Sequence, residues 1–169
     1  MFVRFITRKL VMIGVCVSLL PATGWKVAEY PNTALYSNSL ENPSKMAGDI
    51  LGLINQHRQN KGLAPLQMNN AISAEAEKHS SDMAARSVVF GHDGFENRVK
   101  KITQQIGGVR ASAENVANGQ LSAKEVVEGW LKSPGHRRNI EGNFTLTGIG
   151  VVPDKKGTLF YTQIFVRKA

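Results

Sequence analysis

The stretch TGIGVVPDKKGTLFYTQIFV, residues 147–166, places two apolar runs on either side of a short polar segment. From Thr147 to Val151, β-branched or aliphatic residues alternate with glycine, which is the period of a strand with one buried face. Residues 154–157 contain the turn formers Asp and Gly and can reverse the chain onto a second strand over residues 159–166. We therefore predict an antiparallel hairpin at the C-terminus.

Upstream of this hairpin, apolar residues recur at the spacing of helices. The four stripes are Met46, Ile50, Leu53, Ile54 and His57; Ile72, Ala76, His79 and Met83; Phe95, Val99, Ile102 and Ile106; and Val126, Val127, Trp130 and Leu131. The predicted caps are Asn69 or Asn70 for the second helix, the pair Asp93 and Glu96 for the third, and the pair Ser122 and Glu125 for the fourth. Arg98, Lys100 and Lys101 are expected on the solvated side of the third helix. Helices first and strands last indicate an α+β or layered α/β/α domain.

The length of 169 residues favours one compact domain. Its start is typical of a secretory signal, because basic residues precede an apolar run from Leu10 to Leu20 and small residues follow. As a helix this run would rise only about 16 Å, roughly half of a bilayer core. We predict a signal peptide over residues 1–24, a linker or mobile arm over 25–45 and the domain over 46–169. An uncleaved anchor is the alternative.

The only cysteine, Cys16, lies in this apolar run, so the mature chain would have no disulfide and would depend on its packed core. This favours a bacterial protein that is secreted or periplasmic. The net charge of +8 falls to +5 once residues 1–24 are removed. Such a charge suits loose adhesion to anionic envelope polymers or lipid head groups, or simply a well-solvated surface. The sequence lacks the interleaved aromatic and basic clusters of nucleic-acid readers, and we expect no nucleic-acid partner.

Three polar residues stand out against these patterns. His92 precedes a predicted helix N-terminus, where the positive end of the dipole favours neutral imidazole, the form that can ligate a metal or accept a proton. An ordinary loop residue is the alternative. Glu114 lies inside a short extended segment, residues 111–119, and needs either solvent or a partner. His79 lies on an apolar stripe and is predicted to be a hydrogen-bonded core residue rather than a ligand.

Seven blocks of the sequence resemble, in order and spacing, the CAP superfamily, also called the SCP-like extracellular domain. They are LINQHRQNKGLAPLQMN, AEKHSSDMAAR, FGHDGF, AENVANG, GWLKSPGHRRNI, TGIGV and FYTQIF, and together they cover about residues 46–167. The resemblance is to a bacterial-type secreted member. It implies an α/β fold, a three-layer α-β-α sandwich with a central antiparallel sheet.

The resemblance also implies a shallow cleft lined by two histidines and two acids, which in several members binds a divalent metal, often zinc. The matching positions here are His92 in FGHDGF, Glu114 in AEN and His136 in PGHRRN. The second acid of the eukaryotic members corresponds to Ser133, so the set of four is incomplete. Glu128 does not replace it, because positions 128 and 133 of a helix point about 140° apart.

These cleft residues leave three classes of function open. His92, His136 and Glu114 could bind zinc or another divalent cation with one position open, as in a protease-like or envelope-acting hydrolase. Ser133, His136 and Glu114 could instead form a nucleophilic triad. The same residues could be only a structural network of an envelope protein.

We favour a fourth use of the cleft, a binding module of unknown ligand; the ligand classes left open are a metal, a lipid or sterol, and an envelope polymer. A catalytic constellation is incomplete, since Ser133 is a poor base. We further expect a monomer with no transmembrane anchor once the signal is cleaved.

Overall fold

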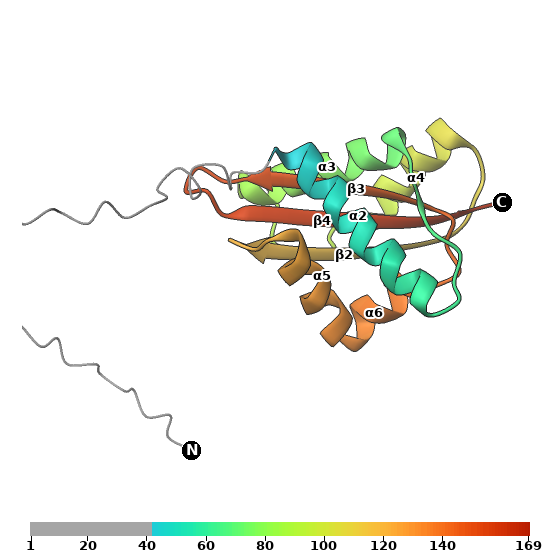
Figure 1. Cartoon of the computed structure of the whole chain (residues 1–169). Helices are drawn as coiled ribbons and strands as arrows, with labels where there is room; N and C mark the ends of the chain where they lie inside the picture. The colour runs from blue at the N-terminus through green and yellow to red at the C-terminus, as the bar shows by residue number, and fades with distance from the viewer. Residues whose placement is uncertain (1–41) are drawn as a thin grey trace, which may run out of the picture.

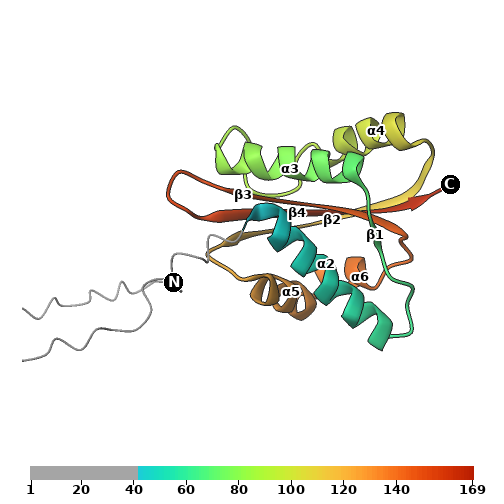
Figure 2. The ribbon, with the colours of Figure 1, turned by 45° about the horizontal axis from the view of Figure 1, so that its top comes forward.

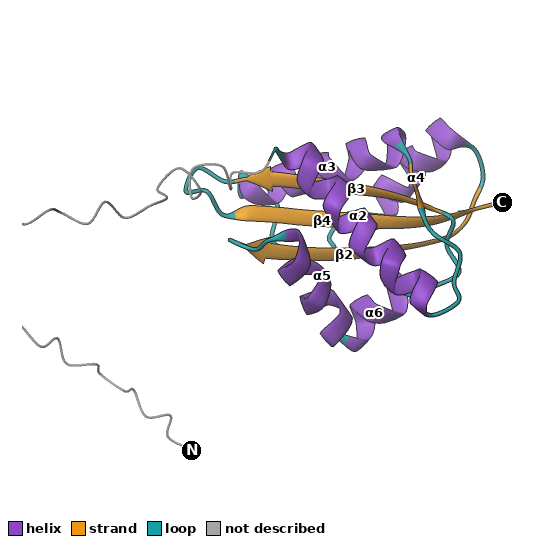
Figure 3. Cartoon of the chain, viewed as in Figure 1, coloured by secondary structure: helices purple, strands orange, loops and turns teal. Residues whose placement is uncertain are grey.

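The computed structural model describes residues 42–169. The predicted signal peptide and nearly all of the predicted arm lie outside the described residues. In chain order the elements are α2 (Pro43–Asn60), β1 (Gln67–Met68), α3 (Asn70–Ala84), α4 (Phe95–Ile106), β2 (Val109–Gly119), α5 (Ala123–Lys132), α6 (Pro134–Ile140), β3 (Leu146–Pro153) and β4 (Leu159–Lys168). Figures 1 and 3 show how the helices flank the strands.

The four strands form one sheet in the order β1-β3-β4-β2. The predicted hairpin is confirmed: β3 and β4 are antiparallel, the Asp154 amide donates to the Thr158 carbonyl at 2.8 Å, and Gly157 takes the turn at φ 82°. β2 pairs antiparallel with the far side of β4 and so ends the sheet. The two-residue β1 pairs parallel with β3; this strand was not predicted, because two residues are too short to show a strand pattern. The three longer strands are antiparallel, as expected.

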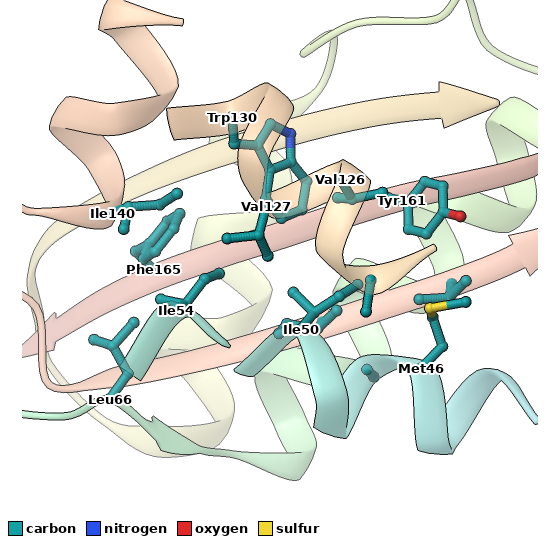
Figure 4. Close-up of a cluster of buried hydrophobic side chains, with 14 residues drawn as sticks. Met46, Ile50, Ile54, Leu66, Val126, Val127, Trp130, Ile140, Tyr161 and Phe165 are labelled. Carbon is teal, nitrogen blue, oxygen red and sulfur yellow. The ribbon is translucent and has the colours of Figure 1, made fainter. Parts of the chain in front are cut away.

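Helices cover both faces of this sheet, which confirms the three-layer architecture. Figure 2 shows α3 and α4 on one side and α2, α5 and α6 on the other. The larger core lies on the second side, where the stripes of α2 and α5 meet alternate residues of β4 (Figure 4). Trp130 is 2% exposed there, and its indole N–H donates to the Val116 carbonyl at 3.2 Å. The burial of these stripes is the main apolar driving force for the fold.

On the other face of the sheet the apolar core is smaller, because α3 lies directly on β3. Gly148 and Gly150 allow this close contact, since a Cβ at Gly150 would come within 2.2 Å of the Glu77 amide nitrogen. Around this contact, Ile72 and Ile102 pack against Ile164 of β4. The glycines that alternate in the opening stretch therefore mark a close approach of helix and strand.

Local capping decides where most helices begin. Asn69 caps α3 by accepting from the Ile72 amide at 3.2 Å, and Ser122 with Glu125 forms the predicted capping box of α5. Asn42 caps α2 with proline at the first helical position, so this helix takes in residues 43–45, which the sequence analysis assigned to the arm.

One local prediction is wrong, and one helix was not predicted. Asp93 and Glu96 form no capping box, because α4 begins after Gly94, whose φ of 77° is the left-handed conformation and which makes no side-chain cap. The helix α5 ends at Lys132, and Pro134 occupies the first turn of a further helix, α6, which was not predicted. Proline lacks only an amide that would be unpaired at this position, so one residue can end one helix and start another. Within residues 42–169 no helix is long and apolar enough to cross a membrane.

Candidate functional site

The candidate site is organised by two neighbouring residues of the edge strand β2. Successive side chains of a strand point to opposite faces of its sheet. Glu114 stands opposite Ile164, which packs under α3 and α4, and Asn115 stands opposite Gln163. Glu114 therefore faces one helical layer and Asn115 faces the other. Because β2 lies at the edge, groups from both layers can meet around it.

On the first side, Arg98 of α4 holds the Glu114 carboxylate in a bidentate ion pair. Arg98 Nε lies 2.9 Å from Glu114 Oε2, and Nη2 lies 2.8 Å from Oε1. Both side chains are buried, Glu114 at 2% exposure and Arg98 at 10%. Arg98 Nη1 also donates to the Asp93 carbonyl at 2.9 Å, which fixes the loop before α4. The carboxylate that needed a partner has found one.

Arg98 corrects the prediction that it would face solvent with Lys100 and Lys101. Arg98 points into the domain because the buried Glu114 carboxylate lies beneath α4. A buried Glu114 without a counter-charge would be far less stable than the ion pair. One signal could have indicated this position. Arg98 precedes the fully buried Ile102 by four residues, so both lie on the same face of the helix.

His92 completes this side of the site. Its Nδ1 lies 3.0 Å from Glu114 Oε1, and the side chain is 52% exposed. A carboxylate accepts, so Nδ1 is the donor and Nε2 of a neutral ring keeps its lone pair. No other hydrogen bond of the His92 ring is found within residues 42–169. The hydrogen bond from Nδ1 to Glu114 therefore fixes the orientation of the imidazole, and Nε2 remains available to a ligand.

On the second side, amide hydrogen bonds hold α6 against β2. Asn115 Nδ2 donates to the His136 carbonyl at 3.2 Å. Asn139 Nδ2 donates to Asn115 Oδ1 at 2.9 Å and to the Glu114 carbonyl at 3.2 Å. This neutral network places His136 at the same strand edge as His92.

The two histidines lie within electrostatic reach of each other. Desolvation lowers the pKa of the half-buried His136, and the electrostatic interaction with His92 lowers it further. A lowered pKa favours neutral imidazole at pH 7, the form with a free lone pair. His79 behaves differently: it is 2% exposed, its Nε2 lies 2.9 Å from the Gly91 carbonyl oxygen, and desolvation lowers its pKa. The prediction of a hydrogen-bonded core histidine is confirmed.

The expected three-ligand metal set does not fit this geometry. Among the described residues, no three His, Cys, Asp or Glu side chains are grouped so that they could hold one ion. The carboxylate of Glu114 explains this, because both oxygens accept from Arg98 and one also accepts from His92. Glu114 therefore supports His92 through a hydrogen bond and is not itself free to ligate a metal. The available nitrogen ligands are His92 and His136.

The alternative triad finds no supporting contact either. Ser133 lies between α5 and α6, and its hydroxyl does not cap α6. The Glu114 carboxylate is bonded to His92 and Arg98, and in the described part of the chain no hydrogen bond joins Ser133 to His136. Glu128 is exposed and lies 3.9 Å from Lys124, so it does not supply the missing acid.

Comparison with known proteins fits this architecture. A match to the family described as CAP, the cysteine-rich secretory protein family, spans residues 51–165. The chain belongs to the CAP family. That span includes every residue of the site just described.

Relatives of this CAP chain are found in bacteria. The protein YkwD of Bacillus subtilis (strain 168) is 33% identical over 153 residues, covering 89% of this chain and 56% of YkwD, so the chain spans about half the length of that relative. The crystal structure of an extracellular protein containing a SCP domain from Bacillus anthracis str. Ames is 31% identical with a TM-score of 0.61, over 75% of this chain and 44% of that one. A cysteine-rich secretory protein from Staphylococcus aureus subsp. aureus Mu50, 22% identical with a TM-score of 0.64 over 76% and 40% of the two chains, shares the fold.

Proposed function

We propose that this CAP domain is an exported binding module in which His92 and His136 hold the ligand at the edge of the sheet. Export is supported by the signal-like start of the sequence and by the similarity to an extracellular protein of Bacillus anthracis. The single observation that carries the binding role is the hydrogen-bonded chain from Arg98 through Glu114 to His92.

This chain matches the way proteins prepare a histidine for a metal. A ligating imidazole commonly donates its second ring N–H to a carboxylate, which fixes the tautomer and the ring orientation. Glu114 does this for His92, and Arg98 holds Glu114 in turn. A half-exposed imidazole with such buried support is prepared for contact with a ligand, whereas an ordinary loop histidine needs no buried carboxylate.

The ligand class is a divalent transition metal, zinc first, bound through the two imidazole nitrogens. Imidazole suits zinc, copper and nickel better than magnesium or calcium, which prefer oxygen. A bound zinc ion would supply a Lewis-acidic centre that accepts a further small ligand. Glu114 and Arg98 would orient His92, and Asn115 would hold the helix that carries His136.

Calorimetric titration of the purified, metal-free protein with Zn²⁺ tests this function. His92→Ala and His136→Ala should each weaken zinc binding at least about tenfold, and Glu114→Gln should weaken it by a similar factor through loss of orientation. His57→Ala is the matched control, because His57 is bonded to Glu141 at the far end of α6 and should leave zinc affinity unchanged.

Two results would reject the proposal: a wild-type protein that does not bind zinc, or an equal loss in the His57 control. Binding of fatty acids or sterols that survives the His92 and His136 substitutions would place the function outside this site. Hydrolysis of casein or peptidoglycan by the wild type, lost in the same variants, would instead support the hydrolase alternative.

A further inference from the structure

A second surface lies at the end of the domain where α3 ends and the β3–β4 hairpin turns (Figures 1 and 2). Two residues of the loop after α3 are unusually exposed for their type: Val89 at 75% and Phe90 at 45%. Within residues 42–169 only one other large apolar side chain, Met68, is classed as exposed, at 37%. Adjacent exposed apolar residues on a folded domain indicate a contact surface.

This loop is held in place rather than left free. Val88 packs on a small cluster with Met83 and Phe160, and the ring of Phe90 meets that of Phe160 edge to face at 6.4 Å. The Ser87 hydroxyl donates to the Asp82 carbonyl at 3.0 Å. Together these side chains border an open hollow of about 510 Å³. The fold therefore presents Val89 and Phe90 outward from a packed base.

Cations lie beside this apolar loop. Arg86 lines the same hollow as Val89 and also a neighbouring hollow of about 460 Å³, which Lys155 and Lys156 line from the hairpin. The one acid of this second hollow, Asp154, is turned toward its own backbone, since its Oδ1 accepts from the Lys156 and Thr158 amides at 2.8 and 2.9 Å. Three positive charges and one negative charge leave the rim net positive.

Arg86 is placed there by its backbone. It has a φ of 58°, the left-handed conformation that is uncommon for a residue with a side chain. Its amide donates to the Met83 carbonyl at 3.0 Å, so the bend directly follows the end of α3. The bend separates the helix from the apolar loop and keeps a cation between the two hollows.

We propose that this end of the domain, the tip surface (Arg86, Val89, Phe90, Lys155 and Lys156), docks on anionic phospholipid bilayers. The cations match the negative potential of such a surface, and the two apolar side chains match the boundary between head groups and acyl chains. An anionic polymer would use the cations and leave Val89 and Phe90 in water. The tip surface shares no residue with the His92–His136 site, so this inference is independent of the proposed function.

Vesicle co-sedimentation of the full chain tests the tip surface, with phosphatidylglycerol mixed into phosphatidylcholine and with phosphatidylcholine alone. The wild type should bind the anionic vesicles more tightly. Lys155→Glu/Lys156→Glu should weaken that binding at least about tenfold, and Val89→Ser/Phe90→Ser should weaken it severalfold. All variants change exposed residues, and urea denaturation checks that each remains folded.

Matched controls separate the tip surface from general charge, from general apolarity and from the N-terminal residues, which every variant retains. Lys100→Glu/Arg110→Glu makes the same charge change elsewhere, and Met68→Ser removes the other exposed apolar side chain. Neither should alter binding. Equal wild-type binding to both vesicle types overturns the proposal, as does unchanged binding by Val89→Ser/Phe90→Ser. Loss in the lysine variant alone would likewise overturn it, and would indicate a polyanion instead.

Discussion

Glu114 and Asn115 are neighbours in sequence, yet the two sides of β2 hold them in different ways. Glu114 belongs to an ionic arrangement, with Arg98 on both carboxylate oxygens and His92 on one. Asn115 belongs to a neutral one, with the Asn139 amide on its oxygen and a backbone carbonyl of α6 on its nitrogen. One strand edge thus carries a charged half-site and an uncharged half-site.

The difference shows what each half-site depends on. A buried carboxylate that loses its cation is left as an uncompensated charge, which costs several kcal/mol. A neutral amide that loses one hydrogen-bond partner lowers the free energy of unfolding by less, about 1–3 kcal/mol. We therefore expect loss of the Arg98 cation to lower the free energy of unfolding more than loss of an amide hydrogen bond around Asn115.

Arg98→Met should have the largest effect. It should lower the free energy of unfolding by about 3–5 kcal/mol at pH 7, measured by urea denaturation, because Glu114 remains buried without a counter-charge.

Two further variants sharpen this test. Arg110→Met, at an exposed position of β2, should change stability by no more than about 0.5 kcal/mol. The double variant Arg98→Met/Glu114→Met should be more stable than Arg98→Met alone, because no charge is left buried. A double variant as unstable as the single one would contradict the ionic description.

Asn139→Ala should have a smaller effect on the other half-site. Loss of its donors to Asn115 and to the Glu114 carbonyl should lower the free energy of unfolding by about 1–2 kcal/mol. The difference from wild type should not vary between pH 5 and pH 8, because no titrating group is removed. Asn97→Ala, on an exposed face of α4, is the control. A loss equal to that of Arg98→Met would remove the contrast between the half-sites.

The smallest effect is expected in the pH dependence of stability, to which the buried His79 and the half-buried His136 contribute. Desolvation lowers the pKa of His79, so on acidification the unfolded chain takes up the proton first, near pH 6.5. Stability should fall as the pH drops below about 6.5 toward the lowered folded-state value. His79→Gln keeps a donor for the Gly91 carbonyl and should flatten this slope in urea denaturation.

A residual slope should remain in His79→Gln, because burial lowers the pKa of His136 as well. A wild-type slope that His79→Gln leaves intact would show that this histidine does not titrate with folding.

Much of the fold was predictable because its signals are local. The stripes of α2, α3 and α5, the capping box at Ser122 and the turn before Gly157 each depend on residues within a few positions of one another. The elements that were missed depend on context. α6 needed a proline to act as a start, and β1 is only two residues long and exists because β3 lies beside it.

The candidate site divides in the same way. His92, Glu114 and His136 could be named from their motifs, and the need of Glu114 for a partner followed from its place in a strand. Arg98 was assigned to solvent, because the charge pattern of one helix says nothing about what the neighbouring layer buries beneath it. Asn139 was not singled out, since its partners are 24 and 25 residues away.

The sequence by itself determined the helices α2 to α5, the hairpin, the buried role of His79 and the candidates His92, Glu114 and His136, because periodicity, capping and motifs act over a few residues. Tertiary structure alone decided that β2 lies at the sheet edge with Glu114 and Asn115 facing opposite layers. Only that placement pairs Glu114 with Arg98 and brings His92 and His136 from different layers to one edge. Alternation along a strand assigns side chains to two faces, but the packing of distant elements decides what each face meets.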